Sequence, residues 1–233
     1  MFVIDTHTHT SEASGCSSIS GRKLVSAYIE AGYDGIVTTD HLVHRHRKGG
    51  SRTELWERQV EMLAAGYNEA SRWAADRDFA VFFGLEIRLA GSVNDYLLYG
   101  ADIPFLKSHP FLTESNIEEL HAICQDSGIL VFQAHPFRAF MTPEDPRFID
   151  GIEVYNGHTD HESRNALAYR YALENHLLMI SGSDTHSPRQ VGRGGLVLEE
   201  IPDSMEDIVM MLAEGQIERL LTADSESAEY VHP

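Results

Sequence analysis

Residues 1–10 read MFVIDTHTHT, and this stretch sets the expectation for the rest of the chain. An apolar β-type run over residues 2–5 is followed at once by two histidines, His7 and His9. Side chains at i and i+2 of an extended segment project to the same side, so these two imidazoles can chelate one metal ion. The pattern predicts a buried strand with metal-ligating side chains directly after it.

Strand-like and helix-like segments alternate along the rest of the chain. Several β-type runs are almost continuously apolar, which is typical of strands buried on both faces of a parallel sheet. This alternation predicts right-handed βαβ units, in either a barrel or a doubly wound sheet. No GxGxxG or GxxxxGK[ST] loop follows a run, which favours the α/β barrel. The further β-type runs are residues 35–39, 79–86, 96–99, 129–133, 151–155, 177–181 and 195–198.

Helical periodicity fills the intervals between these runs. One predicted helix begins with a capping box formed by Ser115 and Glu118 and ends at Gly128. The other predicted helices span residues 21–31, 53–75, 160–175 and 203–213.

The composition is that of an ordinary globular protein with a strong acidic excess. The chain has 233 residues, 36 Asp+Glu, 18 Lys+Arg, 13 His and 2 Cys, giving a formal net charge of −18. Contacts with nucleic acid or anionic membrane need Lys and Arg, so we expect no bulk nucleic-acid binding and no membrane binding. We find no signal-peptide pattern and no apolar run near the ~18 residues of a membrane span. We therefore expect one cytoplasmic domain over residues 1–233.

Metal-ligating residue types recur where the predicted strands end. In a parallel barrel the carboxyl ends of all strands open onto one face, where active sites lie. A mixture of imidazole and carboxylate suits Zn²⁺, Mn²⁺ or Fe, and the set exceeds the roughly four ligands that one zinc needs. We therefore expect two or three divalent ions. Besides His7 and His9, the candidate ligands are His41, Glu86, His135, Asp184 and His186.

Five short motifs in this order resemble the PHP (polymerase and histidinol phosphatase) metallo-hydrolases. The resemblance runs from residue 5 to about residue 198. It implies a distorted (β/α)7 TIM-like barrel whose metal site, at the C-terminal ends of the strands, hydrolyses phosphate esters. The motifs are DTHTHT at 5–10, TDH at 39–41, GLE at 84–86, AHP at 134–136 and SDTH at 183–186.

The resemblance also implies a division of the ligands among up to three ions. Family members usually carry Asp or His a few residues after the first pair. Here Glu12 is the first substitute and Cys16 the second, because a thiolate also binds Zn²⁺. Asp95 stands where a His is usual, and because Asp binds the same metals the resemblance makes it a further candidate ligand. One ion would take His7, His9, Glu86 and Asp184, a second would share Glu86 and add His135, and a third would use His41 and His186.

A cationic segment follows His41 after a short interval. Residues 44–52 read HRHRKGGSR and hold four of the 18 cations, so we expect either a phosphate-attracting lid or a solvated loop. The candidate phosphate-binding residues are Arg45, Arg47, Arg138 and Arg193.

These features predict a metal-dependent phosphoesterase that hydrolyses a small phosphate monoester or short nucleotide by a metal-bridged hydroxide. The family resemblance implies a histidinol-phosphatase-like enzyme. Glu86 would position the metals, Asp184 would steer the proton of the nucleophile, and His186 would assist the leaving group. An amidohydrolase-like activity and a non-catalytic metal-binding regulatory module are the alternatives. The sequence leaves the oligomeric state open.

Overall fold

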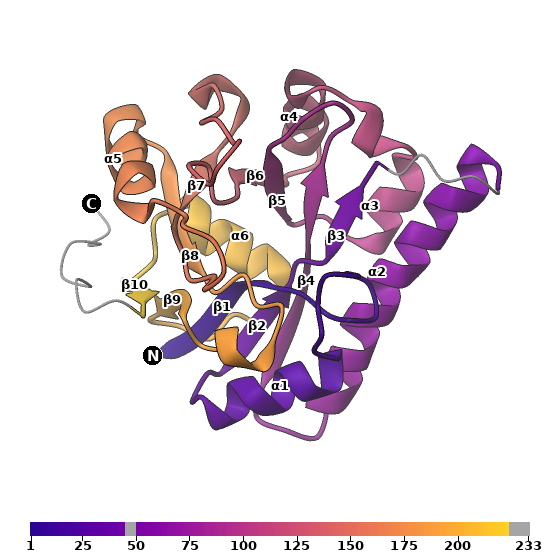
Figure 1. Cartoon of the computed structure of the whole chain (residues 1–233). Coiled ribbons are helices and arrows are strands. Elements are labelled where there is room, and N and C mark those ends of the chain that lie inside the picture. The colour runs from indigo at the N-terminus through magenta and orange to yellow at the C-terminus, as the bar shows by residue number, and fades with distance from the viewer. Residues whose placement is uncertain (45–49, 224–233) are drawn as a thin grey trace.

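The computed structural model describes residues 1–44 and 50–223 as an α/β fold around one curved sheet (Figure 1). The strand order is β10-β9-β1-β2-β4-β5-β6-β7-β8, with β3 paired to β4. The sheet nearly closes, because β8 packs beside β1 and a bridge joins Thr8 to Thr185. The strands are β1 (Phe2–Thr8), β2 (Gly35–Thr38), β3 (His41–Val43), β4 (Ala80–Arg88), β5 (Asp95–Tyr99), β6 (Leu130–Gln133), β7 (Gly151–Asn156), β8 (Leu178–Gly182), β9 (Gly194–Leu198) and β10 (Arg219–Thr222).

The α/β barrel class is confirmed, whereas the count of seven strands is not. All eight predicted runs are strands, but β3 and β10 were not predicted, because three or four residues carry too little periodicity. The sheet is also mixed: β5 is antiparallel to β4 and β6, and β9 is antiparallel to β1. The reversal of β5 places its first residue, Asp95, opposite Arg88 at the carboxyl end of β4. Asp95, the first residue of β5, therefore lies at the same edge of the sheet as the residues at the carboxyl ends of the parallel strands.

Helices cover the outside of the sheet, with α2 along β4 and α5 against β7 (Figure 1). The fourth helix is capped by Asn116 with Glu119, one residue later than predicted, because Asn116 Oδ1 accepts from the Glu119 N–H. The short helix α3 was not predicted. The helices are α1 (Gly21–Glu30), α2 (Arg52–Ala74), α3 (Ile103–Ser108), α4 (Ile117–Asp126), α5 (Asn165–Asn175) and α6 (Met205–Ala213).

Apolar side chains of the strands pack against these helices to form the core, with Ile4, Leu85 and Val131 fully buried. Burial of this kind is the main favourable contribution to folding and holds the carboxyl ends of the strands in fixed positions. Within the described part of the chain, no helix has the length and apolarity needed to cross a membrane.

Candidate metal centre

Histidines and carboxylates from distant parts of the chain meet at the carboxyl ends of the strands. His7 lies in β1, which extends to Thr8, and His9 follows directly. His41 opens β3, Glu86 lies near the end of β4, His135 follows β6, and Asp184 and His186 follow β8. His7, His9, Glu86, His135 and Asp184 are buried to 98% or more. The arrangement is the one expected when parallel strands end at a common face.

Glu86 lies at the centre of the imidazoles. Its Oε2 is 2.7 Å from His41 Nδ1, 3.5 Å from His9 Nε2 and 3.6 Å from His7 Nε2. Its Oε1 lies 3.1 Å from His135 Nε2. Burial opposes ionisation of Glu86, but the charges of His41 and His7 hold its pKa well below its usual range. The carboxylate is therefore placed to bridge more than one cation.

Asp184 forms the other anionic side of the cluster. Its Oδ1 lies 3.2 Å from His9 Nε2, 3.3 Å from His186 Nδ1 and 3.5 Å from His7 Nε2. Burial opposes ionisation of Asp184 too, but the charge of His7 and the neighbouring imidazoles of His186 and His9 lower its pKa well below the usual range. Burial lowers the pKa of His186, but Asp184 and Cys16 beside it raise that pKa to about 10. The two carboxylates are thus set up to stay ionised beside positive charge.

Three polar atoms of the cluster are buried without a hydrogen-bond partner among the described residues: His7 Nε2, His9 Nε2 and Glu86 Oε2. All three belong to one group whose ligand atoms lie within 4.8 Å of one another. A buried polar atom that lacks a partner costs free energy, about 1–3 kcal/mol each. A divalent cation would satisfy all three at once, and imidazole with carboxylate is a donor set that Zn²⁺, Mn²⁺ and Fe accept. The residues therefore fit a metal.

Further overlapping groups share these residues, which matches the expectation of more than one ion. They are His7, His135 and Asp184; Glu86, Asp95 and His135; His9, His41 and His186; and His158, Asp184 and His186.

The backbone at two of the predicted ligands adopts the left-handed region. His135 has φ +30° and Asp184 has φ +51°. Residues with a Cβ seldom adopt this region, and where they do the conformation costs of the order of 1–3 kcal/mol and clusters at functional sites. Both residues directly follow the ends of strands, so the strained turn directs the side chain back into the cluster.

Glu153 in β7 is the residue that sequence reasoning missed. It is fully buried, its Oε1 accepts from His7 Nδ1 at 2.9 Å, and its Oε2 accepts from the His135 N–H and Asn156 Nδ2, each at 2.9 Å. A carboxylate on Nδ1 directs the unprotonated Nε2 toward a metal. The signal available in the sequence was one charged residue inside the apolar run 151–155.

Two aspartates next to the motif histidines hold the backbone around them. Asp5 accepts from the His7 and Ser183 N–H groups, and burial raises its pKa to about 6 although these hydrogen bonds lower it. Asp40 accepts from the Ser14 hydroxyl at 2.6 Å, and Ser14 in turn accepts from the His41 N–H. These residues position ligands rather than supply them.

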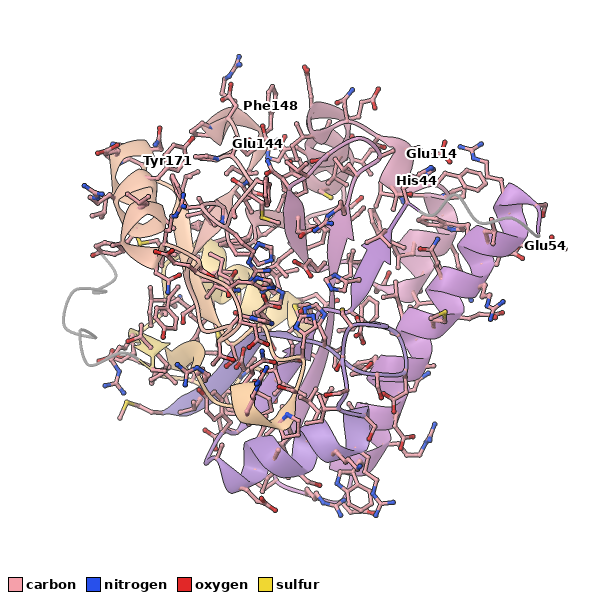
Figure 2. The ribbon with its side chains drawn as sticks, viewed as in Figure 1. His44, Glu54, Glu114, Glu144, Phe148 and Tyr171 are labelled. Carbon is pink, nitrogen blue, oxygen red and sulfur yellow. The ribbon has the colours of Figure 1, made fainter. Side chains whose placement is uncertain are left out.

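The loop that carries His135 is fastened at its far end. Glu144 Oε2 accepts from the Tyr96 hydroxyl at 2.6 Å, and the Glu144 N–H donates to Gln133 at 2.7 Å. The Tyr171 hydroxyl donates to the Glu144 carbonyl at 2.7 Å, and Figure 2 shows these two labelled residues on neighbouring segments. The loop therefore presents His135 and Arg138 from an anchored frame.

Two predicted ligands are engaged elsewhere. Glu12 does not enter the cluster: its Oε2 accepts from the Gly21 N–H at 3.1 Å, at the start of α1, where free N–H groups attract a carboxylate. The structure thus corrects the expectation for Glu12. Asp95 lies within reach of Glu86 and His135, but both of its oxygens accept from Arg88, one of them at 2.6 Å.

The predicted phosphate-binding arginines divide into three cases. Arg138 Nη2 donates to Asp184 Oδ2 at 2.6 Å and to Asn156 Oδ1 at 3.2 Å, and its Nε is buried with no partner among residues 1–44 and 50–223. Arg193 is directed away from the cluster, because its Nε donates to the Gly157 carbonyl at 2.9 Å. Arg45 and Arg47 lie outside the described residues, and so does most of the predicted lid.

A pocket of about 480 Å³ opens over the cluster. Cations that the sequence did not single out, Arg88 and Arg189, line it together with Arg138 and His158. A larger hollow of about 700 Å³ surrounds Phe79 at the opposite end of the strands, but none of the ligating groups lines it. The candidate site is therefore the smaller pocket, because the metal-ligating side chains line it.

Comparisons with known proteins agree with this fold. The family model described as PHP-associated matches residues 162–217. A two-domain protein from Bacteroides vulgatus, containing a predicted PHP-like metal-dependent phosphoesterase, is similar with TM-score 0.62 and 21% identity over 94% of this chain and 66% of that one. A Chromobacterium violaceum amidohydrolase with bound sulfate is similar with TM-score 0.59 and 16% identity over 96% and 99%. No curated protein matches the sequence.

Endonuclease Q in complex with a 27-mer DNA duplex carrying an abasic lesion is also similar, with TM-score 0.65 and 14% identity over 95% of this chain and 60% of that one. The chain spans about two thirds or less of the Bacteroides protein and of endonuclease Q. Together these findings confirm the resemblance to the PHP-domain family that the motifs indicated.

The endonuclease corrects one expectation. We expected the net charge of −18 to exclude nucleic-acid partners, but a protein with this fold binds a DNA duplex at its active site. Net charge describes the average field, whereas a phosphate contact depends on local cations such as Arg88 and Arg138 at the mouth of the pocket. The exclusion was wrong.

Proposed function

We propose that this chain is a metal-dependent phosphoesterase whose reaction takes place over the His/carboxylate cluster. The observation that carries the proposal is the convergence of three unpartnered buried atoms, His7 Nε2, His9 Nε2 and Glu86 Oε2. The likeness to a PHP-like metal-dependent phosphoesterase supports it.

Most of the residues that would hold the ions are those predicted from the sequence. Glu12 is held at α1 instead, and ligation by Asp95, which accepts from Arg88, stays a prediction. Bound divalent cations would supply positive charge to the phosphoryl oxygens and lower the pKa of water. His7, His9, Glu86 and Asp184 would hold one ion, Glu86 and His135 a second, and His41 and His186 a third.

Arg138 is the protein group that we propose binds the substrate phosphate. Its Nη2 is already held at Asp184 and Asn156, so the guanidinium is fixed at the edge of the cluster without a large loss of side-chain freedom on binding. Guanidinium and phosphate form charge-assisted hydrogen bonds, often two at once. Arg138 would thus orient the phosphorus toward the carboxylates and neutralise charge that builds on its oxygens.

We propose that Asp184 steers and accepts the proton of the attacking water. Its Oδ2 lies beside Arg138, which lowers the pKa of Asp184 together with the histidines and keeps it ionised. Asn156 Nδ2 donates to the same oxygen at 3.2 Å and fixes its direction. A general base must be correctly oriented as well as ionised, and both conditions hold here. The leaving-group role of His186 stays a prediction.

The substrate that we propose is a small phosphate monoester or a short nucleotide. A pocket of about 480 Å³ with cations at its mouth has the size and charge for such a molecule. The amidohydrolase neighbour with bound sulfate keeps a second candidate open, in which the same cluster directs water at a carbonyl carbon.

The test replaces His9, Glu86 and Asp184 one at a time with Ala and measures hydrolysis of a chromogenic phosphate ester with added Mn²⁺ or Zn²⁺. We expect each variant to lose more than about 100-fold in kcat/KM, since loss of even an outer partner of a ligand costs 10- to 100-fold. The exposed Glu57→Ala variant is the matched control. Full activity in all three variants would contradict the proposal. Parallel assays with abasic duplex DNA and with amide substrates separate the substrate classes.

A further inference from the structure

Three imidazoles gather on the outer side of the cluster. The ring centres of His9 and His41 are 4.4 Å apart and those of His9 and His186 are 4.2 Å apart. Their ligating nitrogens lie within 4.8 Å of one another, and His9 Nε2 is buried with no hydrogen-bond partner in the described part of the chain. His41 and His186 are 21% and 15% exposed, so this position faces the pocket. All three donors of this group are imidazoles, so the group resembles a cation site with room for a further ligand on the pocket side.

The Cys16 side chain lies at this position. It lines the same pocket as His41 and His186, close enough to both imidazoles for them to favour the thiolate form of its side chain. The first substitute suggested by the sequence, Glu12, is held at the start of α1 instead. Of the two residues proposed to replace the usual Asp or His, the structure therefore favours the cysteine.

The backbone around Cys16 is fastened to the cluster on its C-terminal side. The Ser17 hydroxyl donates to the His9 carbonyl at 3.1 Å, and the Ser18 N–H donates to the His186 carbonyl at 2.8 Å. These bonds tie the Cys16 loop to the backbone of two of the three imidazoles. Although Cys16 is exposed, its neighbours Ser17 and Ser18 are hydrogen-bonded to the backbone of His9 and His186, and these bonds hold the Cys16 loop beside the cluster.

We propose that Cys16 ligates, as a thiolate, the ion held by His41 and His186, and that this outer position selects a thiophilic cation such as Zn²⁺. Thiolate and imidazole together suit Zn²⁺, whereas Mn²⁺ and Mg²⁺ prefer oxygen donors. On binding, the thiol releases its proton to solvent and its sulfur forms the bond to the cation. The inference rests on the metal centre of the proposed function, but it concerns a ligand and a selectivity that the centre does not require.

Cobalt substitution tests the sulfur bond directly. The purified chain, freed of metal and reloaded with Co²⁺, should show a thiolate-to-cobalt charge-transfer absorption in the near ultraviolet. Cys16→Ser should abolish this absorption, whereas Cys124→Ala and Glu12→Ala should retain it. Because Cys124 is buried in the core and Glu12 lies at α1, these two variants control for the second thiol and for the other candidate ligand.

Elemental analysis of the zinc-loaded protein gives the second readout. Cys16→Ser should lose about one equivalent of Zn²⁺, and Cys16→Asp should regain metal without regaining the cobalt absorption. A wild-type protein that binds Co²⁺ without the absorption, or a Cys16→Ser variant that keeps it, would overturn the inference. If the absorption behaves as expected but no phosphate ester is hydrolysed, the proposed function fails while the ligand assignment stands.

Discussion

Replacement of Glu153 by Gln tests whether a buried carboxylate sets the state of the metal-ligating histidines. One oxygen of Glu153 accepts from His7 Nδ1, and the other accepts from the His135 N–H and from Asn156 Nδ2. The amide of Gln is nearly the same size but has only one acceptor oxygen. We expect this oxygen to face the two donors, which leaves the NH₂ group against His7. His7 Nδ1 must then accept, so the ring proton moves to Nε2, the atom that should bind metal.

The expected magnitude follows from this change of tautomer. Loss of a partner that orients a ligand typically lowers metal affinity about 10- to 100-fold, which corresponds to roughly 1.4–2.8 kcal/mol. The opposite orientation of the amide is also unfavourable. Its NH₂ group would then face two other donors, the His135 N–H and Asn156 Nδ2, which now lie 2.9 Å from the carboxylate. Full burial of Glu153 also keeps water from compensating for the loss.

The assay is a competition titration against a chromophoric chelator, paired with ¹⁵N NMR of the histidine rings. Glu153→Gln should bind metal 10- to 100-fold more weakly. In the metal-free variant, at a pH where the His7 ring is neutral, the ring proton should lie on Nε2 rather than on Nδ1. The exposed Glu57→Gln variant makes the same chemical change away from the site and should bind like the wild type. An unchanged affinity together with an unchanged His7 tautomer would refute this reasoning.

Three further results are expected. Gly182→Ala should lower metal content and destabilise the fold by about 1–3 kcal/mol in chemical denaturation, because its Cβ would lie 2.4 Å from the His7 Cβ; unaltered metal content would contradict this. Arg138→Ala should raise KM for phosphorylated substrates about 10- to 100-fold with a smaller change for neutral esters, whereas equal changes would remove Arg138 from phosphate binding. The pKa of His186 is raised from 6.5 to about 10, so the stability it gives the metal-free fold is present below pH 6.5 and lost as pH rises toward 10. The metal-free protein should therefore melt at a lower temperature at pH 9 than at pH 7, and metal affinity should rise over the same interval because bound metal displaces the His186 proton; a flat profile in both would contradict it.

The barrel and most of the cluster were predictable because two strong signals coincide. Apolar runs mark the buried strands, and His or carboxylate residues stand at their ends, so the geometry of a parallel sheet brings His9, His41 and Asp184 together. This argument needs only the position of each residue relative to its strand. It does not depend on the number of strands, so it holds although the count of seven strands is not confirmed.

Features that depend on hydrogen bonding between distant segments were not predictable in the same way. Glu153 looked like one more residue of an apolar run, and only the fold shows that it joins His7 to His135. Glu12 and Cys16 lie four residues apart, and the sequence could not show that the first would reach Gly21 while the second would reach the imidazoles. The nucleic-acid exclusion failed for a related reason, since a sum of charges contains no information about where they lie.

The central claim is that the buried cluster is a metal centre, and metal content measured beside turnover tests it most directly. Purified wild-type protein should contain at least about two equivalents of divalent metal, and Glu86→Ala should lose most of it together with phosphate-ester hydrolysis, because Glu86 contacts four of the imidazoles. Wild-type protein that binds no stoichiometric metal after incubation with Zn²⁺, Mn²⁺ or Fe²⁺, or a Glu86→Ala variant with unchanged metal content and turnover, would contradict the claim.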